Sequence, residues 1–217
     1  MKFIVQIMNT LIYTVQIMNN KQKEDSTTLE ILQAIDGNQD ITQRHLADTL
    51  NVALGLANSY LKRCVRKGLI KIHQAPANRY LYYLTPSGFA EKSRLTAQYL
   101  SHSFDFYRKA SSSINSVYQL CESNGWKKIL LCGISELAEI ASLREHEYQV
   151  KIVGVFEPDT EIQNFLNFQV WSDLDHCNSF DVLVLTTLNE PLDMYEILLA
   201  REHVDRILIP KILGIRQ

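Results

Sequence analysis

Between residues 41 and 84, the pattern of side chains changes from helical to strand-like. Apolar residues recur at a helical spacing up to about residue 67, and β-branched and aromatic residues typical of strands follow. Thr42 is a suitable N-cap for a short first helix, and Ile41 before it can pack on Leu46 one turn inside as a hydrophobic staple. Apolar residues that recur every three or four positions predict a second helix over residues 54–67. Two runs rich in β-branched and aromatic residues then predict a hairpin, residues 69–73 and 79–84.

Basic residues are concentrated in the same stretch of the chain. Residues 42–79 hold seven Lys and Arg and one acid, Asp48, although the whole chain has a net charge of −2. Two helices and a hairpin with such an excess have the pattern of a winged helix-turn-helix that meets a phosphate backbone. In that fold the second helix enters the major groove, while the first helix and the hairpin contact the backbone.

Asn58 and Ser59 lie on the outward face of the second predicted helix, where side chains reach base edges. An Asn can make two hydrogen bonds to adenine, and a Ser hydroxyl can donate or accept, so we predict that both residues read bases. The other predicted DNA contacts are Thr42, Arg44, Gly55, Lys62, Arg63 and Arg79. The alternative interpretation is that Asn58 and Ser59 only solvate an exposed helix face.

Residues 26–100 resemble a MarR-type winged helix domain, through LEILQAI, ITQRHLADTLNVALGLANSYLKRCVRKGLIKI and YLYYLTPSGFAEKSRLTAQYL. The most specific part is LTPSGFAEKSRLT, which follows the predicted hairpin. The branch that it resembles most is associated with bacterial exopolysaccharide and surface-polysaccharide gene clusters. The resemblance implies a transcriptional regulator that binds double-stranded DNA. Ala53 departs from the pattern, since such helices usually carry a Ser or Thr cap there, and this leaves open the angle at which the second helix begins.

A long helix is predicted over residues 86–124, with Thr85 as its cap and Pro86 in its first turn. Its apolar stripe comprises Phe89, Leu100, Tyr107, Ala110, Ile114, Val117 and Cys121, widened by Tyr99, Phe104 and Phe106. A winged-helix core is too small to cover this much aromatic surface, so we assign the stripe to a homodimer interface. The run Ser111-Ser112-Ser113 is the expected break in the helix, because serines offer the backbone competing hydrogen bonds.

Beyond Gly125 strand-like runs alternate with helical segments, which predicts a small Rossmann-like parallel sheet covered by helices over residues 126–217. The predicted strands are 127–132, 150–156, 168–171, 181–187 and 206–209, and the predicted helices are 135–146 and 191–203. This domain contains eight Lys and Arg against fifteen Asp and Glu, a net charge of −7, so DNA would repel it. The fold class expected for the whole chain is α/β, with a winged helix-turn-helix over residues 26–85.

The predicted turn GISELA, residues 133–138, lies where a dinucleotide fold carries G-x-G-x-x-G/A. The match is partial, because Ser135 replaces the second glycine and Glu136 places a negative charge in the first helical turn. Since ligands of parallel sheets bind beyond the carboxyl ends of the strands, we predict a ligand site at Gly133, Ser135, Glu157, Thr186 and Thr187. The ligand is unknown, and a nucleotide or nucleotide sugar is compatible with this edge. The alternative is a ligand-free structural domain.

Three functions are compatible with these features. The first is a MarR-type DNA-binding regulator whose Rossmann-like domain senses a small molecule, which the resemblance links to polysaccharide biosynthesis. The second is a redox-sensing repressor resembling the Rex family, with NAD(H) as its ligand; the long helix and Ser135 argue against it. The third is an enzyme that binds a nucleotide or sugar and uses the winged helix as an interaction module.

Catalysis has little support in the sequence. The only local group that could carry it is Asp175, His176 and Cys177, and a polar loop explains this group equally well. The four cysteines are too scattered for a disulfide framework or a zinc site, and the six histidines form no ligand-spaced cluster, so no metal is expected. We therefore favour a regulator that is not an enzyme.

Two features of the chain bear on location and on the N-terminal segment. No apolar run approaches the roughly 18 residues of a membrane span, so a cytoplasmic protein is expected. Residues 1–25 contain the repeat VQIMN, at positions 5–9 and 15–19, and we assign no function to this segment.

Overall fold

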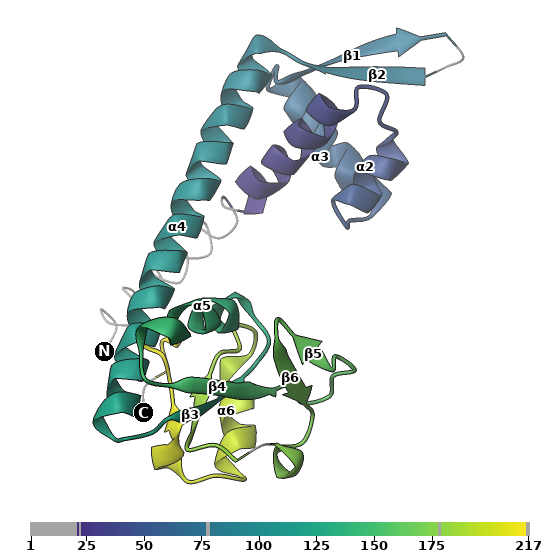
Figure 1. Cartoon of the computed structure of the whole chain (residues 1–217). Coiled ribbons are helices and arrows are strands. Elements are labelled where there is room, and N and C mark those ends of the chain that lie inside the picture. The colour runs from purple at the N-terminus through teal and green to yellow at the C-terminus, as the bar shows by residue number, and fades with distance from the viewer. Residues whose placement is uncertain (1–20, 22, 77–78, 178, 216–217) are drawn as a thin grey trace, which may run out of the picture. The chain divides into compact units, whose positions relative to one another are not determined.

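The computed structural model describes residues 21, 23–76, 79–177 and 179–215. The chain divides into two compact units, Met1–His102 and Ser103–Gln217, each with its own hydrophobic core. The fold is α/β, as predicted, with a winged helix-turn-helix in the first unit and a mostly parallel sheet with helices in the second (Figure 1). The VQIMN repeat lies outside the described residues. None of the helices within the described ranges combines the length and hydrophobicity needed to cross a bilayer.

In the first unit a helix over residues 23–37 precedes the helix-turn-helix and the hairpin (Figure 1). The elements that follow are α2 (Gln43–Thr49), α3 (Leu54–Arg66), β1 (Ile70–Ala75) and β2 (Arg79–Leu84), and then α4 (Pro86–Ser123). β1 and β2 are antiparallel, with Ile70 opposite Leu84 and Ala75 opposite Arg79. The core includes Leu29, Ile31, Leu32, Ile35, Leu46, Ala57, Leu61, Ile70, Tyr82 and Leu95. Helices and hairpin thus share one apolar interior.

The first turn of α2 forms as predicted. Thr42 Oγ1 accepts a hydrogen bond of 3.1 Å from the backbone N–H of His45. Ile41 and Leu46 are both buried in the core of the unit, as a hydrophobic staple requires. By contrast, α3 begins after Ala53 without any side-chain cap. The start of α3 is therefore held by its packing and by its backbone hydrogen bonds.

Thr85 joins the hairpin to α4. Its backbone N–H donates to the carbonyl of Leu69 at 3.0 Å, and its hydroxyl donates to the carbonyl of Gly68 at 2.6 Å. The same hydroxyl accepts from the backbone N–H of Gly88 at 3.0 Å and so caps α4. Gly88 passes so close to the hairpin that a Cβ there would lie 2.1 Å from the Leu69 carbonyl oxygen. The LTPSG stretch therefore fixes the start of α4 against the hairpin.

The second unit contains a sheet with the strand order β5-β6-β4-β3-β7-β8. The strands are β3 (Lys128–Cys132), β4 (Lys151–Phe156), β5 (Asn164–Phe165), β6 (Phe168–Trp171), β7 (Val182–Leu185) and β8 (Ile207–Leu208). All neighbours are parallel except β5 and β6. The five parallel strands lie in the order third, second, first, fourth and fifth, which is the order of a doubly wound nucleotide-binding sheet. The order reverses between β3 and β7, where such sheets bind ligands.

Helices cover both faces of this sheet. They are the C-terminal half of α4, α5 (Glu136–Arg144) and α6 (Pro191–Leu199), with short 3-10 turns at Glu145–Glu147, Leu174–His176, Val204–Arg206 and Lys211–Leu213. Along β3, Ile129 and Leu131 pack with α4 and α5, whereas Leu130 and Cys132 pack with α6. A continuous apolar run is what a strand covered on both faces requires.

The predicted break in α4 is wrong, because the helix continues unbroken through Ser111, Ser112 and Ser113. Ser111 and Ser113 are buried, and Ser113 Oγ accepts a 3.1 Å hydrogen bond from the backbone N–H of Ile212. These small side chains allow close packing of the helix on the sheet domain. Tertiary packing therefore outweighs the tendency of serines to compete for helical backbone groups.

The assignment of the whole apolar stripe of α4 to a dimer interface is also wrong for its C-terminal half. Ala110, Ile114, Val117 and Cys121 are buried in the core of the second unit, against residues of the sheet and of α5. A helix stripe at this spacing looks the same in sequence whether it faces its own sheet or a second protomer. Of the remaining stripe, Phe89, Tyr99, Leu100, Phe104 and Tyr107 are exposed, whereas Phe106 is half-buried against the core of the second unit.

Smaller differences concern strand ends. β7 stops at Leu185, so the last residues of the predicted strand 181–187 lie beyond it. The short antiparallel strand β5 was not predicted. Its two residues carry too little pattern to distinguish a strand from a loop.

Ile114→Ala is expected to lower the free energy of unfolding of the second unit by about 2 to 5 kcal/mol, because the side chain is fully buried. Trp126 and Trp171 are the only tryptophans of the chain, and both lie in this unit. Their fluorescence during a urea titration therefore reports this unit selectively. Leu120→Ala, an exposed position on the same helix, is the control and should change stability by about 0.5 kcal/mol or less. Identical urea midpoints for the two variants would contradict the core assignment.

Candidate nucleic-acid interface

The orientation of α3 is set by its apolar face. Ala57, Leu61 and Cys64 are buried in the core of the first unit, and Tyr60 and Val65 pack against the same cluster. Successive residues of a helix are turned by about 100°, so burying this face leaves the opposite one outward. The outward residues are Gly55, Asn58, Ser59, Lys62 and Arg66, as the spacing predicts, with Asn58 half-buried and the others exposed.

A groove of about 570 Å³ runs between α3, the first turn of α2 and strand β1. It is lined by Gln43, Asn58, Ser59, Leu61, Lys62, Val65, Arg66 and Ile72. Both predicted base readers and two cations thus line a single depression, together with three apolar side chains. Gly55 is exposed at the start of α3 but does not line it.

Asn58 has an unsatisfied polar atom in this groove. Its Oδ1 is buried and has no hydrogen-bond partner among the described residues. A buried acceptor without a partner costs about 1 to 3 kcal/mol, so turning the amide outward to a donor in the groove would relieve an existing penalty. The adenine N6 amino group is such a donor, and its N7 can accept from the other end of the same amide.

The cations of α3 differ in how freely they can reach a phosphate. Lys62 and Arg66 are exposed and line the groove. Arg63 follows Lys62 directly and therefore points to a different side of the helix, where it pairs with Glu24 at 2.8 Å. Lys67 bonds the same carboxylate at 3.2 Å. Hydrogen bonds from Arg63 and Lys67 lower the pKa of Glu24, so this carboxylate is charged at neutral pH and attracts both cations.

The other predicted DNA contacts lie at the edges of this surface. Arg44 is exposed in the first turn of α2, and Thr42 before it uses its hydroxyl oxygen as the cap of that helix. Arg79 is exposed at the start of β2 and pairs with Asp40 at 3.4 Å. Such a surface pair contributes at most about 1 kcal/mol, so a phosphate can compete for the guanidinium.

The buried Tyr82 connects the hairpin to α2. Its backbone N–H donates to the carbonyl of Gln39 at 3.0 Å, and its hydroxyl accepts from Gln43 Nε2 at 3.1 Å. The hairpin and the start of α2 therefore keep a fixed spacing on either side of α3.

Gln43 and Ile72 line the groove but were not predicted from the sequence. Ile72 could have been predicted, because it lies two residues after Ile70 and therefore on the same face of the strand.

The structure brings all predicted ligand-site residues together at the carboxyl ends of β3, β4 and β7. Gly133 follows β3 with a φ of +112°, and a Cβ there would lie 2.4 Å from the backbone nitrogen of Thr187. Thr186 Oγ1 donates to the carbonyl of Gly133 at 2.7 Å, which closes β3 onto β7. Substitution of Gly133 would therefore strain this edge of the sheet, so it is unsuitable as a test of ligand binding.

The polar groups at this edge bond to the chain itself. Ser135 caps α5, since its Oγ accepts from the backbone N–H groups of Leu137 at 3.1 Å and Ala138 at 3.3 Å and donates to the Thr186 carbonyl. Glu157 Oε2 accepts from the backbone N–H of Ile134 at 2.6 Å. These amides are the ones that a dinucleotide fold offers to a pyrophosphate. A ligand here stays a prediction, and an anionic one would have to displace both side chains.

The group suggested for catalysis lies in the 3-10 turn Leu174–His176 and just after it. Asp175 and His176 are exposed, and Asp175 pairs with Arg201 at 3.3 Å. Burial raises the pKa of the Cys177 thiol to about 11, so the thiol is protonated at neutral pH and is a poor nucleophile. Across the part of the chain that the structure describes, His, Cys, Asp and Glu form no group able to hold a metal.

Residues 24–71 match the family model described as winged helix-turn-helix DNA-binding. This match spans most of the first helix, α2, α3 and the start of β1, so it covers the groove-forming helices. It supports a winged helix-turn-helix in this segment and does not extend to the second unit. No curated protein matches the chain.

Among solved structures, the chain is 20% identical to MepR, a transcription regulator of the multidrug efflux pump MepA of Staphylococcus aureus, over 43% of this chain and 79% of that one, with a TM-score of 0.34. It is 18% identical to the adhesin competence repressor AdcR of Streptococcus pyogenes, over 64% and 89%, with a TM-score of 0.37. Human N-acetylserotonin methyltransferase is 12% identical over 79% and 70%, with a TM-score of 0.28. Likenesses at this level carry no conclusion about function.

Lys62→Ala and Arg63→Ala form a matched pair of variants for this surface. Loss of one phosphate contact in each bound subunit should weaken binding of Lys62→Ala to any DNA duplex and reduce the slope of log affinity against log salt concentration by about 0.9 per subunit. Arg63→Ala should change the slope less, because Arg63 already pairs with Glu24 in the free protein. Fluorescence anisotropy with a labelled duplex at several salt concentrations measures both slopes. A larger change for Arg63→Ala than for Lys62→Ala would contradict this assignment of the free cations.

Proposed function

We propose that this protein is a sequence-specific transcriptional regulator that binds double-stranded DNA as a homodimer, with α3 in the major groove. The observation that carries the proposal is the groove along α3, where Asn58, whose buried Oδ1 has no hydrogen-bond partner among the described residues, lies beside the exposed Lys62 and Arg66. The match of residues 24–71 to a DNA-binding winged helix-turn-helix supports the same partner. Amide groups read base edges, and cations hold the phosphates on either side.

Each part of the surface has a distinct role in this proposal. Asn58 and Ser59 read bases, and Lys62 and Arg66 bind the phosphates that border the groove. Arg44 on α2 and Arg79 on β2 contact the backbone on the two sides of α3, as the first helix and wing do in this fold. Thr42 acts indirectly, by holding the first turn of α2.

The second unit does not take part in DNA contact in this proposal. Its net charge of −7 over residues 126–217 opposes approach to a phosphate backbone, whereas the basic excess lies between residues 42 and 79. A small-molecule effector at the carboxyl edge of its sheet, and control of polysaccharide biosynthesis, stay predictions. The hydrogen-bonded state of Ser135 and Glu157 favours a ligand with hydroxyl donors over one with a phosphate at the start of α5.

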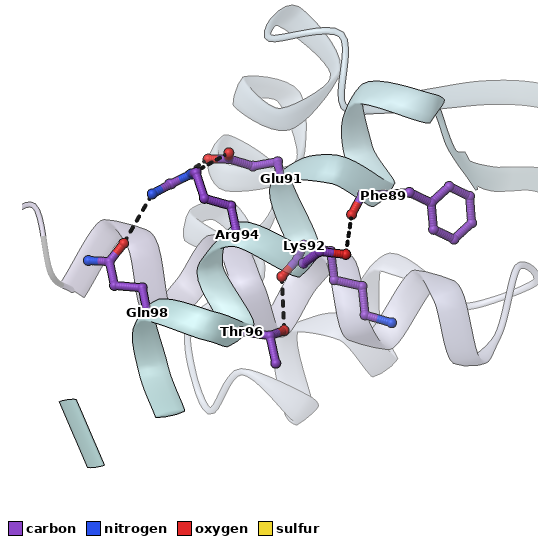
Figure 2. Close-up of polar contacts among 7 residues, drawn as sticks. Phe89, Glu91, Lys92, Arg94, Thr96 and Gln98 are labelled. Atoms are coloured by element: carbon purple, nitrogen blue, oxygen red, sulfur yellow. Dashed lines mark hydrogen bonds and ion pairs between the residues drawn. The ribbon is translucent and has the colours of Figure 1, made fainter. Parts of the chain in front are cut away.

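The exposed part of α4 supports the homodimer. Its uncovered apolar residues are Phe89, Tyr99, Leu100, Phe104 and Tyr107, and all of them except Tyr99 recur at a helical spacing on one side of α4. Figure 2 shows the ring of Phe89 projecting away from Glu91, Arg94 and Gln98. On the opposite side Arg94 bonds Glu91 at 2.7 Å and Gln98 at 3.1 Å, so that side is already satisfied by its own contacts (Figure 2). A two-fold dimer would bury the apolar stripe against itself.

Asn58→Ala should relax the sequence preference of the protein and weaken binding to its preferred duplex by about 1 to 3 kcal/mol. The preferred duplex is obtained by selection from a random pool with the unmodified protein. Competition between this duplex and a scrambled one of equal length measures preference separately from affinity. Lys62→Ala is the matched control, because it should weaken both duplexes alike. If Asn58→Ala discriminates as well as the unmodified protein, α3 does not read bases through this residue.

Leu100→Glu or Tyr107→Glu should convert the proposed dimer into monomers, because each places a charge in the apolar stripe of α4. Light scattering coupled to gel filtration gives the mass directly. Leu120→Glu, an exposed apolar position away from the stripe, should leave the dimer intact. The monomeric variants should also lose tight operator binding, which needs two half-sites about one helical turn apart. An unmodified protein that is monomeric at micromolar concentration would exclude this interface.

A further inference from the structure

An apolar residue of the hairpin faces the body of the domain and is nevertheless uncovered. Side chains two apart on β1 share a face, so Ile70 and Ile72 point to the same side, opposite Leu84 and Tyr82 of β2. Ile70 and Tyr82 are each only 2% exposed, whereas Ile72 is 45% exposed. Ile72 remains open because the groove separates it from α3.

The opposite wall of the groove is apolar at the same place. Leu61 and Val65, one turn apart on α3, line it across from Ile72, and Asn58 lies one turn before Leu61. The result is an apolar slot, defined by Leu61, Val65 and Ile72, next to an amide whose oxygen lacks a partner. Phosphate contact explains Lys62 and Arg66 but gives no reason for this slot, since phosphates do not pack on aliphatic side chains.

We propose that the slot receives the 5-methyl group of a thymine, beside an adenine that Asn58 reads. This inference rests on the proposed DNA-binding function and specifies which base the groove accepts. Thymine is the only standard DNA base that presents a methyl group in the major groove, and aliphatic side chains contact it there. Once turned outward, the amide of Asn58 matches adenine, because Oδ1 then accepts from N6 and Nδ2 donates to N7. The half-site of the operator therefore contains an adenine and a thymine within reach of one turn of α3.

The test uses the full-length protein and the duplex selected from a random pool. Each thymine in turn is replaced by deoxyuridine, which removes only the methyl group, and the dissociation constant is measured by fluorescence anisotropy. One thymine per half-site should show a loss of about fourfold, the equivalent of the about 0.8 kcal/mol that burial of one methylene-sized group contributes. Replacing that T·A pair with 5-methylcytosine paired with guanine should bind better than unmodified cytosine at the same position, because the methyl group is restored.

The variant Ile72→Ser tests whether the methyl group is bound in the slot. In this variant the thymine and deoxyuridine duplexes should bind equally, because the apolar wall is lost. Ile162→Ser, an exposed isoleucine of the second unit, is the matched control and should keep the fourfold difference. The deoxyuridine series on the unmodified protein does not depend on the folding of any variant.

The outcomes separate this inference from the proposed function. If the protein selects a duplex and Asn58→Ala relaxes its preference, but no deoxyuridine substitution weakens binding, the function stands and the methyl slot is overturned. A deoxyuridine effect that persists unchanged in Ile72→Ser also overturns the slot. A pool from which no duplex is enriched overturns the proposed function, and this inference with it.

Discussion

Burial of one face of α3 is the constraint on which the candidate interface depends. Ala57, Leu61 and Cys64 face the core shared with the first helix and the hairpin, and their burial there removes apolar surface from water. The helical repeat then determines that Asn58, Lys62 and Arg66 face outward, without any further interaction that selects them. The uncapped start at Ala53 makes this dependence stronger, since no cap holds the helix in place.

The hairpin converts this exposed face into a groove. Tyr82 holds the start of α2 through Gln39 and Gln43, and Thr85 with Gly88 ties the base of the hairpin to α4. These contacts keep β1 at a distance from α3 that leaves Ile72 open. A slight shift of the hairpin toward α3 would bury Ile72 and close the groove. The geometry of the proposed site is therefore a property of the whole winged domain.

Local pattern was sufficient to predict α2, α3, the hairpin and the start of α4, but the helix over residues 23–37 was not predicted. The spacing of Ala57, Leu61 and Cys64, the cap at Thr42 and the staple between Ile41 and Leu46 depend on residues within a few positions of each other. The alternation of strands and helices beyond Gly125 predicted the parallel sheet for the same reason.

Interactions between distant residues could not be predicted. Nothing near Arg63 in sequence indicates that Glu24, from another helix, neutralises it. Ile114 and Tyr107 share one helical stripe, yet only Ile114 finds a partner in the sheet domain. The ligand edge shows the same limit, because Ser135 and Glu157 have suitable chemistry for a ligand but bond to Thr186 and Ile134 of their own chain.

Hydrogen–deuterium exchange on the free protein and on its complex with the selected duplex tests the central claim most directly. Amide exchange in α2, α3 and the hairpin should become slower on DNA binding, because helix and wing meet the duplex there. Peptides from β3, β4 and β7 should exchange at unchanged rates, because the acidic second unit stays away from the phosphates. Protection confined to the second unit, or an α3 that exchanges equally fast with and without DNA, would contradict that claim.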